Sequence, residues 1–503
     1  MRYLLKGFVC SADFTTLSRK AILIENERIA AIENDIIGSC AADRVFEFKD
    51  EIISPGFIDA HGHSDISALA EPECFSKITQ GITAEVCGNC GLSPFPLTAK
   101  NFEHIQNLYS SYGLEINWND LRSYQEAIRR IKPALRLFPL SGHNTLRAAV
   151  NGYEDVPLSE KNLRTMCELL ASQLLDSSPG LSAGLLYVPG IFAETNELFT
   201  LMQVLAKHDK VYTTHLRSEG DKLLESLEET LCIAEEAKLK KVLISHLKTA
   251  GKDNFHKLDA ALNMIREFRS RGMDVRFDRY PYIESQTMLS VTLGEKYASY
   301  SDSKLSQLLQ SNIEQLRAIE HLHTIRDQSY WSTRRLAGTT SAAYLQYQGR
   351  ILSEISPDPA ETVVQILKDA AKDSTVAAAS MSEENMRKII SAPEAMFGSD
   401  GNALSPDYRF GRPHPRSFGS AAKFARILLD SGVEITQLCR KMAGNAAEFF
   451  TLANCGSLKP GNFADITVFS PENIDSRADF ADPCRPAEGI PLVFTKGIAH
   501  HLR

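Results

Sequence analysis

The sequence predicts an α/β protein whose core is a (β/α)8 barrel, and two observations support this. Short apolar runs rich in Val, Ile, Leu and Phe alternate with long helical stretches through the middle of the chain, and eight such runs can be counted. Strands that alternate with helices form a parallel sheet, and eight of these units close into a barrel. The 503 residues, 43% of them apolar, suffice for a core of this size.

The eight predicted strands lead into polar residues of catalytic type. In chain order the runs are GFIDAHGH, ITAEVCGN, ALRLFPLSGH, GLSAGLLY, KVYTTHL, KVLISHL, DVRFDRYPY and EAMFGSDG. Between several of them the apolar residues recur with the 3.6-residue period of an amphipathic helix. These helical segments are 195–209, 220–237 and 255–272.

The two chain ends and one long interval depart from this alternation. Residues 1–54 and 450–503 contain short strand-like runs such as YLLKGFVC and FADITVFS, so we expect β structure at both ends and the barrel at 55–449. More than 100 residues separate the seventh and eighth strands, which is too long for one loop and one helix. An inserted subdomain is therefore expected at about 285–391.

Composition excludes several classes of function. The net charge is -8 and no block of basic residues exists, so we expect no nucleic-acid partner and no anionic membrane surface. No apolar run has the length of a membrane span, and the N-terminal residues lack the pattern of a secretory signal. We expect a cytoplasmic protein. Without a secretory signal, the ten cysteines are not expected to form a disulfide framework.

The stretch GITAEVCGNCG places Cys87 and Cys90 three positions apart. No second CxxC and no Cys/His set at zinc-finger spacing accompanies it, which argues against a structural zinc knuckle. A thioredoxin-type pair opens a helix, whereas GLSPFPL follows here with two prolines. The spacing alone leaves a redox role open.

Residues that bind metals in proteins lie at or just after the ends of six predicted strands. They are His61, His63, Cys90, His143, His215, His246 and Asp400. In a barrel these strand ends converge on one face, where catalytic residues sit. A single histidine is more often a hydrogen-bonded core or surface residue, but this many at one face predict a metal centre. Mixed His, Cys and Asp ligands suit zinc without excluding other divalent ions.

Individual members of this set differ in what they predict. His61 and His63 are two apart in a strand, so both side chains point to the same side. A second HxH, His321 and His323, lies in a helical pattern where positions two apart diverge, so we expect no metal there. His143 either supports the site from outside or contacts substrate.

Asp400 is the candidate general acid/base, because a zinc ion lowers the pKa of water and polarises a carbonyl, and such a site needs a group that moves protons. The alternative for Asp400 is a structural residue, either a helix cap or a turn residue before Gly401.

Several motifs together resemble the D-aminoacylase (N-acyl-D-amino-acid deacylase) branch of the metal-dependent amidohydrolase superfamily. They are PGFIDAHGHSD, GITAEVCGNCGLSPFPL, GLSAGLLYVPG, THLRSEGDKLLESLEE, ISHLKTAG, RYPY, GSDG with PHPRSFG, and GSLKPGNFADITVF. The resemblance extends over nearly the whole chain. It implies an amidohydrolase barrel with a small β-sandwich domain built from both termini, here 1–54 with 450–503.

The resemblance also implies roles for the ligand residues. Cys90, His215 and His246 would form one tight zinc site, and His61 and His63 a second, weaker one with Asp400 beside it. Cys87 has no counterpart among the family's ligands, so we expect a small buried strand residue there.

Four further residues match positions at which the family binds the substrate carboxylate. They are Tyr187, Lys248, Tyr282 and Arg416. A carboxylate needs a cation and oriented hydroxyls, although Lys248 and Arg416 could also be ordinary surface charges. The chain departs from the family after RYPY, where IESQTML with Glu284 and Gln286 replaces a run of small residues. This change leaves the side-chain specificity open.

The sequence therefore predicts a zinc-dependent hydrolase that cleaves N-acyl-D-amino acids, or a related N-acyl compound, to a carboxylate and a free amine. One alternative is a hydantoinase-like cyclic-amide hydrolase or a tailoring deacylase that acts on a larger natural product. A second alternative, a non-catalytic binding scaffold, is disfavoured because all the ligand-type residues are present. The expected partner is a small N-acyl substrate, and the oligomeric state is left open, a homo-oligomer included.

Overall fold

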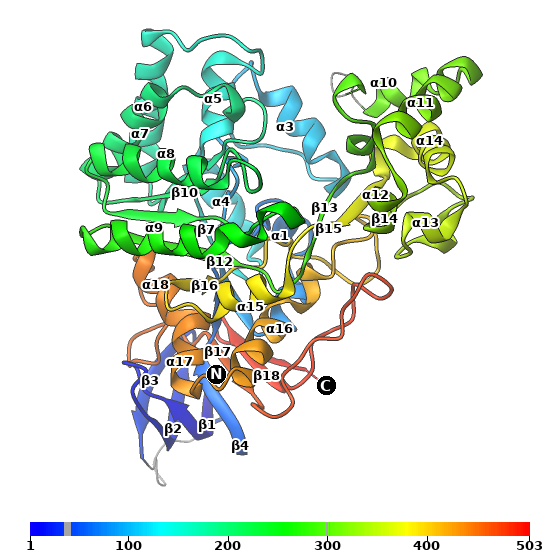
Figure 1. Ribbon diagram of the computed structural model, residues 1–503. Helices are drawn as coiled ribbons and strands as arrows, with labels where there is room; N and C mark the ends of the chain where they lie inside the picture. Colours follow the sequence, from blue (N-terminus) through cyan, green and yellow to red (C-terminus); the bar gives the residue numbers. More distant parts are fainter. Residues whose placement is uncertain (35–41, 298–299, 301, 503) are drawn as a thin grey trace.

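The computed structural model describes residues 1–34, 42–297, 300 and 302–502. Three regions can be followed in Figure 1: a central barrel surrounded by helices, a β-sheet region that holds both chain ends, and a separate group of helices around α10 to α14. Among the described residues no helix is long and apolar enough to cross a membrane.

The barrel is closed by parallel pairing. Its strands are β5 (Phe57–Asp59), β6 (Ile82–Cys87), β7 (Arg136–Pro139), β8 (Ser141–Gly142), β9 (Gly180–Gly184), β10 (Val211–His215), β11 (Lys241–Ile244), β12 (Asp274–Arg279) and β16 (Ala395–Phe397). The sheets run β5-β6-β7 and β8-β9-β10-β11-β12-β16. Strands β7 and β8 are two halves of one strand interrupted at Leu140, since β7 pairs with β6 and β8 with β9. A parallel bridge between Gly62 and Gly401 joins the last strand to the first.

Each of the eight predicted strands thus becomes a strand of the barrel, and the predicted fold class is confirmed. The predicted amphipathic segments are also helical, as α7 (Thr195–Lys207), α8 (Leu223–Glu236) and α9 (Leu258–Ser270). On α7 the buried residues recur at helical spacing and pack in the same apolar cluster as Tyr212 of β10. The buried apolar residues of α8 and α9 belong to the same cluster, so all three helices pack their apolar side against the barrel strands.

Further helices surround the barrel. They are α1 (Ser67–Ala70), α2 (Phe75–Ile78), α3 (Phe102–Leu108), α4 (Leu121–Ile131), α5 (His143–Asn151), α6 (Glu160–Leu175), α15 (Glu383–Ser391), α16 (Arg416–Asp430), α17 (Ile435–Cys439) and α18 (Asn445–Phe449).

Strands from both chain ends share one seven-stranded sheet, in the order β19-β18-β17-β4-β1-β2-β3. They are β1 (Arg2–Cys10), β2 (Leu17–Glu25), β3 (Arg28–Glu33), β4 (Arg44–Pro55), β17 (Ile466–Phe469), β18 (Leu492–Thr495) and β19 (Ile498–His501). The antiparallel pairing of β17 with β4 joins the two ends. Strand β4 leads directly into β5, so the sheet is attached to the start of the barrel. That 1–54 and 450–503 form a separate domain stays a prediction.

The long interval before β16 contains a small sheet and a group of helices. They are β13 (Glu284–Met288), β14 (Arg334–Gly338), β15 (Thr375–Ala379), α10 (Asp302–Leu308), α11 (Asn312–Ile325), α12 (Gln328–Ser332), α13 (Leu352–Ile355) and α14 (Pro359–Ala370). The three strands are antiparallel, and the region has its own apolar cluster that includes Leu305, Trp331 and Leu367. Figure 1 shows α10, α11, α13 and α14 apart from the helices of the barrel.

The last helix inside the predicted bounds of 285–391 packs differently. Helix α15 contacts α16 and β16, and its residues Met386 and Ile390 belong to an apolar cluster shared with α16. It therefore forms part of the barrel wall. The bounds of the inserted subdomain stay a prediction.

A buried charge network lies at the seam where the last barrel strand meets the first. Lys77 of α2 is fully buried, and its ammonium lies 2.8 Å from Asp59 Oδ2 and 2.8 Å from Glu85 Oε2. It also donates to Ser399 Oγ (2.9 Å) and to the Gly401 carbonyl (2.9 Å), on either side of Asp400. One cation thus connects β5, β6 and the loop that follows β16.

Replacing Lys77 with methionine should leave two carboxylates buried without their cation. Removing one partner of a buried ion pair costs about 3–5 kcal/mol, so the protein should unfold at a clearly lower denaturant concentration. Urea titrations followed by circular dichroism measure this. The exposed Lys372 is the control, because Lys372→Met should shift the transition little. An unchanged transition in Lys77→Met would contradict the network's role.

Candidate metal centre

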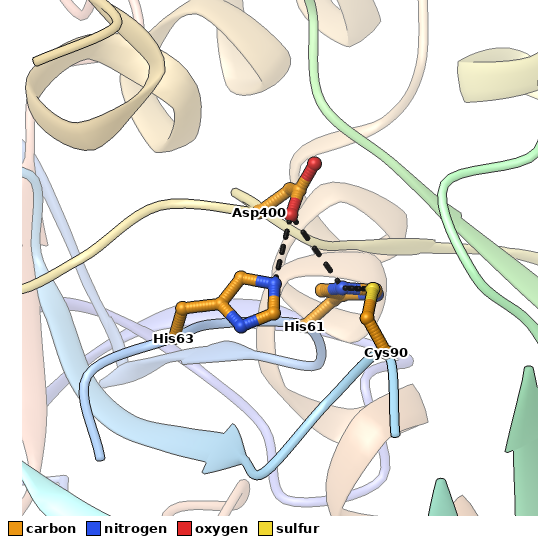
Figure 2. A group of neighbouring side chains, drawn as sticks. All are labelled: His61, His63, Cys90 and Asp400. Carbon is orange, nitrogen blue, oxygen red and sulfur yellow. Dashed lines mark hydrogen bonds and ion pairs between the residues drawn. The ribbon is translucent and has the colours of Figure 1, made fainter. Parts of the chain in front are cut away.

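The loops that follow the barrel strands bring five predicted ligands and Asp400 together in two overlapping groups. The first group is His61, His63, Cys90 and Asp400, and the second is Cys90, His215 and His246. Within each group, atoms that could bind a metal lie within 4.8 Å of one another. Figure 2 shows the first group, with Asp400 above the two imidazoles and the Cys90 thiol beside His61. Cys90 belongs to both groups and therefore lies at the centre of the site.

Imidazole nitrogens surround the Cys90 sulfur. Its Sγ atom lies 3.5 Å from His61 Nε2, 3.5 Å from His246 Nε2 and 3.9 Å from His215 Nδ1. Two of these nitrogens, His215 Nδ1 and His246 Nε2, are themselves 3.0 Å apart. A thiolate and imidazoles are the donors that zinc prefers in proteins, so the chemistry of this donor set fits a zinc ion.

Carboxylates hold the far side of these imidazole rings. Asp278 Oδ2 lies 3.1 Å from His61 Nδ1, and its other oxygen accepts the His246 backbone N–H at 3.0 Å. Glu219 lies 2.9 Å from His246 Nδ1 and 3.6 Å from His215 Nε2. At His61 and His246 the carboxylate on the outer nitrogen fixes the ring and its tautomer, and leaves the inner nitrogen free to bind a metal.

Asp278 and Glu219 were not predicted from the sequence. Only their positions in the sequence could have indicated them: Asp278 lies one residue before the end of a barrel strand, and Glu219 lies four residues after His215. Neither position says which way a side chain points. Their role became visible only when the strands were placed side by side.

Asp400 is held between the histidines and a cation. Its Oδ1 atom lies 3.0 Å from His63 Nε2 and 3.7 Å from His61 Nε2, while Oδ2 pairs with Arg416 Nη1 at 2.7 Å. Burial alone would raise the pKa of this carboxyl, but Arg416 and the histidines hold it well below its usual value. Asp400 is therefore a carboxylate at neutral pH, with Oδ1 turned toward the candidate metal site.

The pKa values of the inner groups have opposite shifts. Burial would raise the pKa of the Cys90 thiol, yet the charge of His61 and hydrogen bonds from His215 and His246 bring it well below its usual value. Burial would lower the pKa of His63, but Asp400 and Cys90 raise it to about 10. The thiolate of Cys90 and the carboxylate of Asp400 thus favour positive charge between them. Protons supply that charge on the histidines, and a bound metal ion would supply it by displacing those protons.

The backbone is strained at three site residues. Cys90, His246 and Asp400 have φ values of 53°, 37° and 51°, in the left-handed region that residues with a Cβ rarely adopt. Such strain persists at functional sites when surrounding contacts enforce it. At Gly184 a Cβ atom would lie 2.1 Å from the Cys90 carbonyl oxygen, so only glycine there lets the cysteine loop approach strand β9.

The predicted carboxylate-binding residues lie around this centre. The Lys248 ammonium contacts Glu219 and lies 2.8 Å from His246 Nδ1. The Tyr187 ring packs edge-on against His215, with 4.8 Å between ring centroids, and remains 45% exposed. Arg416 is paired with Asp400.

The two tyrosines of RYPY, Tyr280 and the predicted Tyr282, differ in their surroundings. The Tyr282 hydroxyl lies within 3.5 Å of the Pro415 and Ala478 carbonyls, which it can serve as a donor. Tyr280 instead lies under the Arg416 guanidinium, 5.1 Å from its ring centroid, and its pKa is lowered because the positive charges of Lys248, Arg279 and Arg416 outweigh the effect of burial. Tyr280 therefore lies close to Lys248 and Arg416, two of the predicted carboxylate-binding residues.

Other cysteine and histidine residues are placed outside the centre. The His143 ring lies 2.8 Å from Glu197, in neither ligand group. Cys87 is fully buried, as expected. His321 lies against the Leu293 carbonyl and His323 against Asp358, and neither belongs to a ligand group among the described residues.

A cavity of about 340 Å³ adjoins the centre on the side of Asp400 and Arg416. Its wall includes Gln286 and Met288 of strand β13 and Thr375 of β15. The inserted region therefore contributes directly to the space beside the candidate acid/base.

No family model matches the chain. D-aminoacylase of Alcaligenes xylosoxydans xylosoxydans is 30% identical, with 98% of this chain and 93% of that protein aligned. N-acyl-D-glutamate deacylase of the same organism is 31% identical over 96% of this chain and 89% of its own length.

Solved structures similar to this chain include deacylases of the same kind. N-acyl-D-glutamate deacylase from Bordetella bronchiseptica, in complex with zinc and a phosphonate mimic of the tetrahedral intermediate, superposes with a TM-score of 0.81 at 26% identity, and the match covers 99% of this chain and 96% of that one. D-aminoacylase, which has a binuclear metal centre, superposes with a TM-score of 0.77 over the same fractions of the two chains. With identity of this level over almost the full length, the chain belongs to the D-aminoacylase (N-acyl-D-amino-acid deacylase) family of amidohydrolases.

Proposed function

We propose that this chain is a zinc-dependent deacylase that hydrolyses the amide bond of N-acyl-D-amino acids to a carboxylate and a free amine. The observation that carries the proposal is the Cys90 thiol among three imidazoles, with the ionised Asp400 directly beside them. The relatives support it, because they are named for this reaction and one was solved with zinc and an intermediate mimic. The D configuration rests on these relatives.

Cys90, His215 and His246 would hold the tighter zinc ion, since they supply one thiolate and two imidazoles, and Glu219 supports the outer nitrogen of His246. His61, His63 and Asp400, together with the shared Cys90, would form a second, weaker site. When bound, zinc supplies Lewis acidity that polarises a carbonyl and lowers the pKa of water.

Asp400 is the proposed proton carrier. Arg416 occupies its Oδ2 atom, whereas Oδ1 faces the histidines, so Oδ1 is positioned to accept a proton from the attacking water. The same oxygen then delivers that proton to the nitrogen of the breaking C–N bond, which leaves as a free amine. The Arg416 ion pair keeps the group ionised before the reaction.

Arg416, Lys248, Tyr187 and Tyr282 are the proposed partners of the substrate carboxylate, and Tyr280, which lies beside the Arg416 guanidinium, is a further candidate. Arg416 presents five N–H donors in a fixed fork, so beside its pair with Asp400 it can bind a second anion. This places the amino-acid half of the substrate on the side of Asp400, where the leaving nitrogen needs a proton. Tyr282 contributes by packing against His414, which precedes Arg416 by two residues.

The function is tested by amine release from paired N-acetyl-D- and N-acetyl-L-amino acids, with the purified protein loaded with zinc. The D compounds should be hydrolysed and their L partners should not. Apolar, polar, acidic and basic side chains are included so that a narrow specificity is not missed. Zinc content is measured on the same sample. Preference for L compounds, or no hydrolysis of any pair with zinc bound, would contradict the proposed function.

Cys90→Ala should lose bound zinc and nearly all activity, because Cys90 is shared by both ligand groups. Zinc measured by mass spectrometry after dialysis should fall well below the wild-type content. Cys87→Ala is the matched control, since Cys87 lies three residues away and faces no ligand group. A Cys90→Ala protein with full zinc content and a normal rate would refute the assignment.

Asp400→Asn should keep zinc and lose turnover. The amide has nearly the same shape but cannot accept a proton, and loss of a general acid/base lowers rates by roughly 10²–10⁴-fold. The measurement is kcat with zinc content determined in parallel. Asp259→Asn on the surface of α9 is the control and should behave like the wild type. Normal kcat in Asp400→Asn would exclude Asp400 as the proton carrier.

A further inference from the structure

A long loop, residues 470–491, joins two neighbouring strands of the seven-stranded sheet. Strands β17 and β18 pair antiparallel, and a turn between such strands needs only about 2–5 residues. An antiparallel bridge between Asp475 and Glu488 closes the base of the loop, so residues 476–487 lie beyond it. In Figure 1 this orange-red loop extends from the sheet toward the inserted region. Loops of this length in a compact protein are commonly functional.

Phe480 lies in the outer part of this loop and is buried. Its side chain packs with Ala337 of β14 and Ala377 of β15 in a small apolar cluster. Gly349 permits the close approach, because a Cβ atom there would lie 2.4 Å from the Phe480 carbonyl oxygen. Arg412 donates to the same carbonyl through Nη2 at 2.9 Å. Phe480 is thus fixed between the inserted region and the segment that leads into α16.

The Phe480 ring also contacts the imidazole of His414. The two rings meet edge-on, with 4.9 Å between their centroids and 72° between their planes. The Tyr282 ring packs against the same imidazole, with 5.3 Å between centroids. Aromatic pairs in this arrangement attract each other beyond the burial of their surface. Two aromatic side chains therefore fix the orientation of the buried His414 ring.

His414 in turn holds the first residue of α16. The backbone N–H of Arg416 donates to His414 Nδ1 at 2.9 Å. The first N–H groups of a helix have no acceptor within the helix, so this one needs a partner outside it. Because Nδ1 accepts, the ring proton is on Nε2, which donates to the Glu284 carbonyl at 3.1 Å. The orientation of this ring therefore decides where Arg416 begins the helix.

We propose that Phe480 is a positioning residue for Arg416, the cation proposed to bind the substrate carboxylate, and that it acts through the His414 ring. The inference rests on the proposed function, which gives Arg416 that role. Arg416 and His414 both line the cavity beside Asp400, whereas Phe480 is not among the described residues of its wall. A displacement of about 1 Å at a group that orients a substrate can cost about 10²-fold in rate.

The experiment compares the best-hydrolysed N-acetyl-D-amino acid of the panel with its carboxamide, which keeps the scissile bond and lacks the carboxylate. Acetate release measures both reactions. In the zinc-loaded wild-type protein, kcat/KM for the acid should exceed that for the carboxamide by roughly 100-fold. Phe480→Ala should lower this ratio at least about tenfold with zinc content unchanged, and KM for the acid should rise more than kcat falls.

Two further variants separate positioning from a loss of stability. Ile474→Ala is the matched control, because Ile474 is fully buried in the same loop but belongs to a different apolar cluster, with Phe424 and Phe469. It should unfold at a lower temperature than the wild type and keep the wild-type ratio. Phe480→Tyr retains an aromatic ring against His414 and should restore the ratio to within about threefold of the wild type.

The outcomes distinguish this inference from the proposed function. A wild-type ratio in folded, zinc-loaded Phe480→Ala, or an equal fall in Ile474→Ala, would overturn the inference while the deacylase function stands. Equal kcat/KM for the acid and the carboxamide in the wild type would also overturn it, because Arg416 would then not bind the carboxylate. If no N-acyl-D-amino acid is hydrolysed with zinc bound, both fail.

If Phe480→Ala does not fold, Phe480→Leu replaces it. Leucine fills the space beside Ala337 and Ala377 but has no ring edge for His414, so the ratio should again fall at least about tenfold. A wild-type ratio in that variant would overturn the inference.

Discussion

The buried ion pairs of Lys77 are the interaction on which the rest of the site depends. A (β/α)8 barrel has one seam where the last strand meets the first, and here that seam carries Asp400 on one side and His61 and His63 on the other. Lys77 donates to Asp59, which precedes His61 by two residues, and to the carbonyl of Gly401, the residue after Asp400. Asp59 in turn accepts the backbone N–H groups of His61 and Ser399. A lysine without exposed surface is stable only with such partners, so its presence fixes the distance between the two halves of the site.

Around the Cys90 thiol the charges alternate outward. Imidazoles surround the sulfur, and carboxylates of Asp278 and Glu219 hold the outer side of the imidazoles. Lys248 then lies against Glu219. This order explains why so many ionisable groups can be buried beside a metal cation, because each of these side chains lies next to one of opposite charge. A bound metal ion would replace the protons that Cys90 and the surrounding imidazoles otherwise share. The same order also connects Lys248 to His246 through one carboxylate, that of Glu219.

The barrel and the inserted region contribute different parts of the site. Residues proposed for chemistry come from barrel strands or the loops directly after them, which many neighbouring strands hold in place. The cavity wall instead includes β13 and β15, which belong to a three-stranded sheet with its own apolar cluster. Changes in that sheet can alter the shape of the cavity without moving the candidate metal ligands. Gln286, Thr287 and Met288 of the IESQTML segment lie in this wall.

The sequence by itself determined the barrel and most of the centre. Eight apolar runs, each followed by polar residues, were enough, because the period of the pattern reports strands and helices and the fold places strand ends together. The sequence identified His61, His63, Cys90, His215, His246 and Asp400 in this way.

Only the tertiary structure decided which side chains contact them from behind. Asp278 and Glu219 are ordinary carboxylates in the sequence, and their function depends on which strand lies alongside. The different surroundings of Tyr280 and Tyr282 were likewise out of reach, because a proline between two tyrosines at a strand end leaves the direction of each side chain to the packing around it. The packing of α15 was likewise not predicted, because its place in the barrel wall depends on contacts with β16 and with α16, the next helix in the chain.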